Sequence, residues 1–241
     1  MKARVSSWSR PETVGGFARS APNAELMRFA AEEQRRVPGG VALDIGCGAA
    51  RNLLPLSQQG WRAIGLDASE PMLIAAAVRL EADAPAARAA LAIADMDALP
   101  VADGVADLIV AHGIWNLARS SDEFRRAVRE AARVAAPSAA LFVFTFSRQT
   151  LPPSALPVAG ESFVFTQFSG EPQCFLTESQ LIEEMGAAGF TPDAGHPIRE
   201  YNRRPPAAGI EIGGGPPVIY EAAFRAEGGA RATRPPMEPR S

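Results

Sequence analysis

The stretch Val41-Ala42-Leu43-Asp44-Ile45-Gly46-Cys47-Gly48-Ala49-Ala50-Arg51-Asn52 is an apolar strand that runs into a glycine turn. Gly46 and Gly48 let the backbone turn sharply, and they let a ligand approach the main chain without a Cβ in the way. Asp44 stands two residues before the first glycine, and Asp67 ends a second apolar strand. Two acids that frame a glycine turn suit a nucleoside with a positive charge, so this region predicts a cofactor site.

The residues after the turn distinguish between kinds of nucleotide. A helix is expected over residues 49–59, and its N-terminal amides would face the ligand. A dinucleotide site would carry the fingerprint G-x-G-x-x-G, but Ala50 and Arg51 leave the third glycine out. Asp44 would repel a pyrophosphate and attract a cationic ammonium or sulfonium group. Asp67 fits an acid that takes both hydroxyls of an adenosine ribose.

Helix and strand patterns alternate along the chain, which is typical of a parallel sheet covered by helices. Ser69 is the expected cap of one helix, and Pro137 is expected to end another. The patterns predict strands at 41–45, 63–67, 90–94, 106–111, 140–146, 197–204 and 218–225, and helices at 24–36, 49–59, 72–82, 121–135 and from Thr177 to about Gly186.

We expect residues 1–225 to form one domain with an N-terminal arm at 1–23, followed by a disordered tail at 226–241. Residues 147–177 lose both periods and form an insertion with four phenylalanines. This insertion is either a lid over an apolar or flat acceptor or a loop held down by its own packing. In the arm, Trp8 and Phe17 are candidates to close over the site.

Five segments, taken in order, resemble the class I S-adenosylmethionine-dependent methyltransferases, with close similarity over about residues 40–146. The segments are LDIGCG at 43–48, GLDAS at 65–69, ADMDALPVAD at 94–103, DLIVAH at 107–112 and EAARVAAP at 130–137. The resemblance implies a Rossmann-like α/β fold: a seven-stranded, mostly parallel sheet with one antiparallel strand and helices on both faces. It also implies S-adenosyl-L-methionine as cofactor and S-adenosyl-L-homocysteine as product.

The resemblance assigns roles to residues of this chain. Asp44 would lie near the methionine amino group and Asp67 would hold the ribose. Asp95 and Met96 would hold the adenine, although a plain surface turn is the alternative, and Met72 is either a core residue or a cofactor contact. The cofactor-binding candidates are Asp44, Gly46, Cys47, Gly48, Asp67, Ala68, Met72, Asp95, Met96 and His112.

His112 is the most interesting ionisable residue, because it ends a strand where this fold meets its substrate. It is either a catalytic base or acceptor-orienting group near neutral pH, or a structural histidine. Its neighbours Trp115 and Asn116 are the substrate-side candidates. Methyl transfer by in-line displacement needs mainly alignment and exclusion of water, and a base is needed only if the acceptor must lose a proton.

Composition sets the remaining expectations. The chain has 241 residues, 47% of them hydrophobic, and a net charge of -3 without a dense Lys/Arg tract, so no nucleic-acid partner is expected. Cys47 and Cys174 are too few for a disulfide framework or a typical zinc cluster. No signal peptide or membrane-length apolar stretch is found. We therefore expect a cytoplasmic monomer or homodimer without a metal or membrane, acting on a small-molecule acceptor.

Two other functions stay open. An NAD(P)-dependent oxidoreductase would use the same sheet and the same ribose acid. However, the third glycine of its fingerprint is absent here, and its phosphates would lie near Asp44. A non-catalytic S-adenosylmethionine-binding protein would bind the cofactor without turnover. These residues do not distinguish between oxygen, nitrogen, carbon and sulfur as the methylated atom.

Overall fold

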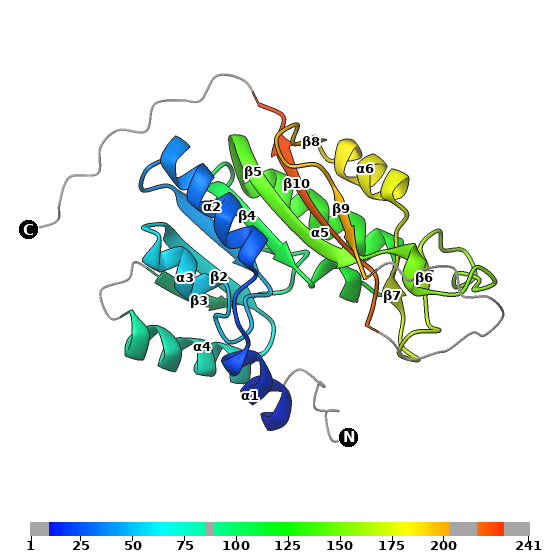
Figure 1. The fold of residues 1–241 in the computed structure, drawn as a ribbon, viewed down its shortest axis with the longest axis horizontal. Coiled ribbons are helices and arrows are strands. Elements are labelled where there is room, and N and C mark those ends of the chain that lie inside the picture. Colours follow the sequence, from blue (N-terminus) through cyan, green and yellow to red (C-terminus); the bar gives the residue numbers. More distant parts are fainter. Residues whose placement is uncertain (1–9, 85–88, 203–215, 229–241) are drawn as a thin grey trace, which may run out of the picture.

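The structure is a computed structural model, and it describes residues 10–84, 89–202 and 216–228. Its main sheet has the strand order β3-β2-β1-β4-β5-β10-β8, with β9 paired to β10 beside this path (Figure 1). The strands of this sheet are β1 (Val41–Ile45), β2 (Arg62–Asp67), β3 (Ala89–Ile93), β4 (Ala106–His112), β5 (Ala135–Phe146), β8 (Phe190–Pro192), β9 (Arg199–Tyr201) and β10 (Ile219–Ala226).

Six α-helices and two short 3₁₀ turns are found in the described residues. Helix α2 begins at the predicted residue because the Asn23 side chain accepts a hydrogen bond from the Leu26 amide. Helix α6 has a full capping box, with Thr177 at the N-cap and Gln180 at N3. The helices are α1 (Pro11–Arg19), α2 (Ala24–Arg36), α3 (Leu53–Gln58), α4 (Glu70–Asp83), α5 (Ser121–Val134) and α6 (Glu178–Ala187), with 3₁₀ turns η2 (Trp115–Leu117) and η3 (Arg148–Thr150).

Strand directions follow the expected pattern. Strands β1 to β5 pair in parallel, and β10 runs antiparallel to β5, β8 and β9. The sheet is therefore mostly parallel with one reversed strand, as expected. The continuous path has seven strands, but one of them, β8, was not predicted. The strand predicted at 197–204 is the short β9, which pairs with β10 beside this path and makes an eighth.

Alternate residues of the central strands build two apolar cores, one on each face of the sheet. Leu43, Ile109 and Leu141 belong to the core covered by α5 and α6. Leu108 and Ala140 precede Ile109 and Leu141 by one position each, and they belong to the core on the opposite face, covered by α2 and α3. Figure 1 shows α2 and α5 on opposite faces of the sheet. Burial on both faces explains why these strands are apolar throughout.

Two predicted elements need correction around the glycine turn and β5. The helix predicted at 49–59 begins only at Leu53, because Ala50 has a φ of 60° and lies in the left-handed region, which interrupts a right-handed helix. The strand predicted at 140–146 begins at Ala135. Helix α5 therefore ends at Val134, and Pro137 lies inside β5 instead of ending the helix.

Smaller differences lie elsewhere. Ser69 occupies the N-cap position of α4, but its side chain does not accept the capping hydrogen bond. Strand β8 was not predicted. Residues 147–177 contain a small hairpin of β6 (Val164–Phe165) and β7 (Gln173–Cys174). Of the earlier predictions, Trp8, residues 203–204 and most of the tail, 229–241, lie outside the described residues.

Among residues 10–84, 89–202 and 216–228, no helix is both long and apolar enough to cross a membrane. In the same part of the chain, no group of three or more His, Cys, Asp or Glu side chains lies close enough to hold a metal ion.

Candidate functional site

A large cavity opens where the parallel strands β1, β2, β3 and β4 end. It has a volume of about 1080 Å³ and lies where the chain reverses its winding between β1 and β4, the usual ligand site of an open α/β sheet. It is lined by Phe17, Gly46, Gly48, Arg51, Asp67, Ala68, Ser69, Met72, Asp95, Met96, Asp97, His112, Gly113, Ile114, Leu117, Arg119, Ser120, Glu123, Arg126 and Phe144.

Asp67 is held in a fixed orientation at the end of β2. Its Oδ2 accepts a hydrogen bond from the Gly48 amide at 2.9 Å, and its Oδ1 accepts one from the Ser69 amide at 2.8 Å. Burial raises the pKa of Asp67, while the two amide bonds lower it. Each carboxylate oxygen can accept more than one hydrogen bond, so this carboxylate can still receive a pair of hydroxyl groups from the cavity.

Both glycines of the turn have a positive φ, a conformation that L side chains rarely adopt. Gly46 has a φ of 72°, and a Cβ at that position would meet Ile114 at 2.8 Å. Gly48 has a φ of 53°, and a Cβ there would come within 3.7 Å of Phe17 and 3.8 Å of Met72. The amide of Gly48 is already bonded to Asp67. The turn therefore makes room for a ligand but does not offer the free amide cradle that a pyrophosphate uses.

Asp44 lies beneath this turn with only 1% of its surface exposed. Its Oδ2 has no hydrogen-bond partner among the described residues. Burial raises the pKa of Asp44 to about 7, with a smaller contribution from Asp67, while Arg51 acts in the opposite direction. A buried, unpaired carboxylate oxygen is costly, and a cationic ligand group nearby would offset that cost.

His112 ends β4 with its ring between two other side chains. It stacks on Phe144 with ring centroids 4.2 Å apart, and Arg51 Nη2 lies 2.9 Å from its Nδ1. Its Nε2 lies 3.2 Å from the amide nitrogen of Asn23, which also donates to Glu221. Burial, followed by the Arg51 charge, lowers the pKa of His112 to about 3.

The low pKa of His112 favours the structural role over that of a base. A base whose pKa is about 3 takes up a proton poorly near neutral pH. The stacking on Phe144 and the contacts with Arg51 and Asn23 instead fit a residue that positions its neighbours.

Ion pairs lie on the cavity wall beyond β3. Arg126 Nε lies 3.0 Å from Asp97 Oδ2, and Arg119 pairs with Glu123 at 3.4 Å. Asp95 and Met96, which follow β3, line the same part of the cavity. Met96 gives this wall an apolar surface, and polar groups lie at its edge. This combination suits an adenine ring.

The structure brings most of the predicted cofactor residues to this cavity. Asp44 and Cys47 are buried behind the glycine turn instead of lining it. Trp115 and Asn116 are 0% and 2% exposed and do not line the cavity, so they lie behind its wall, and their contact with substrate stays a prediction. The predicted residues that line the cavity are Gly46, Gly48, Asp67, Ala68, Met72, Asp95, Met96 and His112.

Among the lining residues that sequence reasoning did not propose for the site are Arg51 and Phe144. Arg51 was considered only as the residue that breaks a glycine fingerprint, although its place in the turn puts a cation at the cavity. Phe144 pairs with His112 across β4 and β5, and strand register would have been the signal for it. Phe17, predicted as a closing residue of the N-terminal arm, does line the cavity.

Comparison with known proteins identifies the domain. Residues 42–138 match the family model described as a methyltransferase domain. An S-adenosylmethionine-dependent methyltransferase from Methanosarcina mazei is 18% identical with a TM-score of 0.65, and the match covers 87% of this chain and 100% of that one. The 1,6-didemethyltoxoflavin N1-methyltransferase of Burkholderia thailandensis, solved with its substrate and S-adenosylhomocysteine, is 19% identical with a TM-score of 0.60, covering 83% and 78%.

A third similar structure has a different activity. The [4+2]-cyclase SpnF is 21% identical with a TM-score of 0.63, and the match covers 88% of this chain and 85% of that one. At these identities the structural likeness shows the fold, and the family model identifies the domain. The chain therefore has the fold of the class I S-adenosylmethionine-dependent methyltransferases, and residues 42–138 match the methyltransferase-domain model.

Proposed function

We propose that this protein transfers a methyl group from S-adenosylmethionine to a small-molecule acceptor. The observation that carries the proposal is Asp67, fixed by two backbone amides on the wall of a large cavity beside a glycine turn. The cavity volume of about 1080 Å³ slightly exceeds the roughly 300–1,000 Å³ typical of single small-molecule pockets. Such a cavity has room for a cofactor and a small acceptor together.

The residues present fit this cofactor. Asp67 would take the ribose hydroxyls, Asp95 and Met96 would hold the adenine, and Gly46 and Gly48 leave space for the chain between them. The unpartnered Oδ2 of Asp44 lies under the same turn and suits the ammonium group of the methionine portion. The bound cofactor supplies a methyl group already activated by a sulfonium.

The side chains of this protein have few chemical tasks beyond alignment. Phe17 and Phe144 line the cavity with apolar surface that excludes water. His112 is neutral at pH 7, and we propose that it orients neighbouring groups instead of removing a proton. We therefore expect an acceptor atom that is nucleophilic without help from a strong protein base.

The two alternatives are weaker. A nicotinamide dinucleotide would place its pyrophosphate at a turn whose Gly48 amide is already bonded to Asp67 and beneath which Asp44 is buried. A non-catalytic or non-methylating role is kept as an outcome of the test, because one protein of similar structure is a cyclase.

The first test is calorimetric titration of S-adenosylhomocysteine into the purified protein, beside NAD as a competing ligand. We expect binding of S-adenosylhomocysteine alone, and its loss in Asp67→Ala. Asp83→Ala is the matched control, since Asp83 is an exposed carboxylate at the end of α4. Binding of NAD instead would overturn the proposal.

A second measurement tests methyl transfer and the size of the acceptor. The protein is incubated with methyl-labelled S-adenosylmethionine and a cell extract, and the label is followed in the ultrafiltrate and in the retained macromolecules. We expect enzyme-dependent label in the ultrafiltrate. Label only in macromolecules would contradict a small-molecule acceptor, and binding without any transfer would favour the non-catalytic alternative.

A further inference from the structure

The ring of His112 lies between two hydrogen-bond donors. Arg51 Nη2 lies 2.9 Å from its Nδ1 and 3.3 Å from its Nε2, and Asn23 Nδ2 lies 3.2 Å from Nε2. The orientation of the Asn23 amide is fixed, because its Oδ1 accepts a hydrogen bond from the Leu26 amide and its Nδ2 also donates to Glu221. Both side chains therefore present N–H groups to the imidazole.

A neutral imidazole has one acceptor nitrogen and one N–H, so it can receive only one of these two donors. The nitrogen that keeps the proton then faces the other donor. Apart from a smaller interaction of the ring with its own backbone, no acceptor group contacts the ring of His112 within residues 10–84, 89–202 and 216–228. A half-satisfied N–H on the cavity wall is unfavourable, and a ligand oxygen would satisfy it.

Arg51 also lacks a contacting partner of opposite charge. In the part of the chain that the structure describes, no acid lies within 4.0 Å of its guanidinium. Burial lowers the pKa of Arg51, and Asp44 raises it from a distance. The N–H donors of a guanidinium match the two oxygens of a carboxylate. Arg51 and His112 thus offer a cation and a neutral N–H to an anionic oxygen group, and we call this pair the anion site.

The anion site lies away from the residues proposed for the nucleoside. Asp67 ends β2 and Asp95 follows β3, whereas His112 ends β4 and stacks on Phe144 of β5. The strand order β3-β2-β1-β4-β5 puts these two pairs of strands on opposite sides of β1. Phe17 and Phe144 add apolar lining to the cavity. The ligand that fits beside the cofactor therefore combines an anionic group with an apolar body.

We propose that the methyl acceptor is a small carboxylic acid with an apolar body, and that Arg51 and His112 bind its carboxylate. This inference rests on the proposed function. One carboxylate oxygen is held in the anion site, and the other uses a lone pair to form the new bond to the methyl carbon. The electron pair of the breaking carbon–sulfur bond stays on sulfur, so the products are a methyl ester and S-adenosylhomocysteine. No proton is transferred, which agrees with the neutral state of His112.

The test determines the chemical form of the methylated product. The protein is incubated with methyl-labelled S-adenosylmethionine and the low-molecular-mass fraction of a cell extract, and the labelled products are then treated with mild alkali. A methyl ester releases its label as volatile methanol, whereas methyl groups on nitrogen, carbon, sulfur or an ether oxygen are retained. We expect the enzyme-dependent label to be released. Label that alkali does not release would overturn the inference and leave methyl transfer intact.

Variants of the anion site supply the second part of the test. Arg51→Met is expected to lower the rate of alkali-labile labelling by roughly 10- to 100-fold, the range of a charge-assisted hydrogen bond. It should bind S-adenosylhomocysteine as wild type does in a calorimetric titration, which also shows that the variant is folded. Arg51→Lys keeps the charge and should retain part of the rate. Arg28→Met is the matched control, because Arg28 lies exposed on α2, and it should retain the full rate.

The remaining outcomes separate this inference from the proposed function. A large loss of affinity for S-adenosylhomocysteine in Arg51→Met would overturn the inference, because Arg51 would then bind the cofactor instead of the acceptor. A full labelling rate in Arg51→Met would overturn it as well. If the wild type does not bind S-adenosylhomocysteine, the proposed function itself fails. If the wild type binds it but forms no labelled product, methyl transfer and this inference fail together.

Discussion

At the scale of single residues, Asp44 makes the stability of the protein depend on pH. Its pKa is raised to about 7 in the folded state, against 3.8 as the ordinary value, mainly by burial. Between these two values the folded protein holds a proton that the unfolded chain has released. The contribution of Asp44 to the free energy of unfolding therefore falls as pH rises toward 7, and stays low above it.

Asp44→Asn removes this dependence, because an amide does not ionise in this range. The variant should gain stability relative to wild type between pH 5 and pH 8 by roughly 3 kcal/mol, at about 1.4 kcal/mol for each pKa unit. Urea unfolding of both proteins at the two pH values measures the difference. A gap that stays constant with pH would show that Asp44 is not buried as the structure has it. The same variant should bind S-adenosylhomocysteine more weakly at pH 8.

His112 should not titrate in the physiological range. The chain has two histidines, so His196→Gln leaves His112 as the sole imidazole for nuclear magnetic resonance. Because its pKa is lowered to about 3 by burial and by Arg51, we expect its ring signals to stay constant from pH 5 to pH 8. A titration centred near pH 6.5 would contradict this and would revive the role of a catalytic base.

The sequence could predict which residues lie near the site, but not the direction in which their side chains point. The turn glycines and Asp67 stand next to strand ends, so local pattern places them at one edge of the sheet. Trp115 and Asn116 follow β4 just as closely, yet their side chains turn into the protein and are buried. Local sequence places a residue near the site, but the direction of its side chain depends on packing against other elements, as Trp115 packs against Phe124 of α5.

Among the secondary-structure elements, the hairpin of β6 and β7 packs against the rest of the protein and does not act as a lid over the cavity. Phe163 is 1% exposed and lies against Phe124, with ring centroids 5.3 Å apart. Phe168 is 42% exposed. No residue of 147–177, all of which are described, lines the main cavity. The structure thus favours the packing alternative for this phenylalanine-rich segment.

Phe163→Ala should therefore cost about 3–5 kcal/mol of stability, as large-to-small changes in a core do, and Phe168→Ala about 1 kcal/mol at most. Neither should change the affinity for S-adenosylhomocysteine by more than a small factor. Phe163→Leu, which keeps most of the volume, provides a folded comparison for the titration. A large loss of affinity in Phe168→Ala would instead assign the hairpin to the site.

Elements were predicted well where a period repeats over many residues. Helix α2 and strand β1 have the predicted bounds because each has a regular apolar face and a clear end. The start of α3 was missed because nothing in the residue type announces that Ala50 takes a left-handed conformation. Strand β8 has only three residues, too few for alternation to appear.

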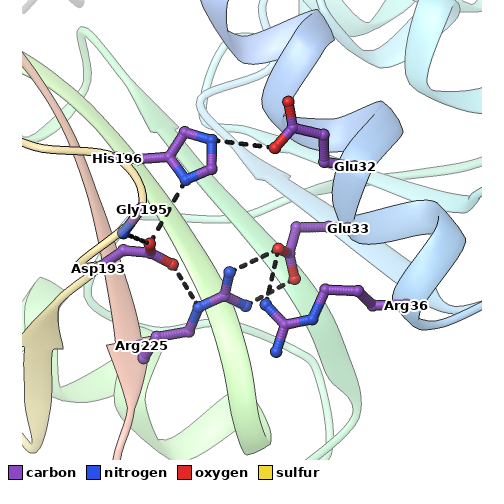
Figure 2. A network of polar contacts seen from close by, with 7 residues as sticks. All are labelled: Glu32, Glu33, Arg36, Asp193, Gly195, His196 and Arg225. Atoms are coloured by element: carbon purple, nitrogen blue, oxygen red, sulfur yellow. Dashed lines mark hydrogen bonds and ion pairs between the residues drawn. The ribbon is translucent and has the colours of Figure 1, made fainter.

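At the scale of the whole molecule, a charged network joins the start of the chain to its last strand (Figure 2). Arg225 of β10 donates to both oxygens of Glu33 on α2, and its Nε donates to Asp193 Oδ2 at 2.6 Å. The partners Glu33 and Arg225 are 192 positions apart, and a pairing over that distance leaves no local signal in the sequence. The network also holds α2, whose N-cap Asn23 contacts His112 in the site.

The stability effects of changing Glu33 and Arg225 should not be additive. The side chain of Glu33 is 5% exposed, so Arg225→Met leaves this buried carboxylate with the more exposed Arg36 as its remaining cation and should cost about 3 kcal/mol. Glu33→Gln should cost less, because the amide oxygen still accepts a hydrogen bond. The double variant should lose less stability than the two single changes added together, by about 1 kcal/mol or more. Urea unfolding of the four proteins measures this coupling, and strict additivity would mean that α2 is held to β10 by apolar packing alone.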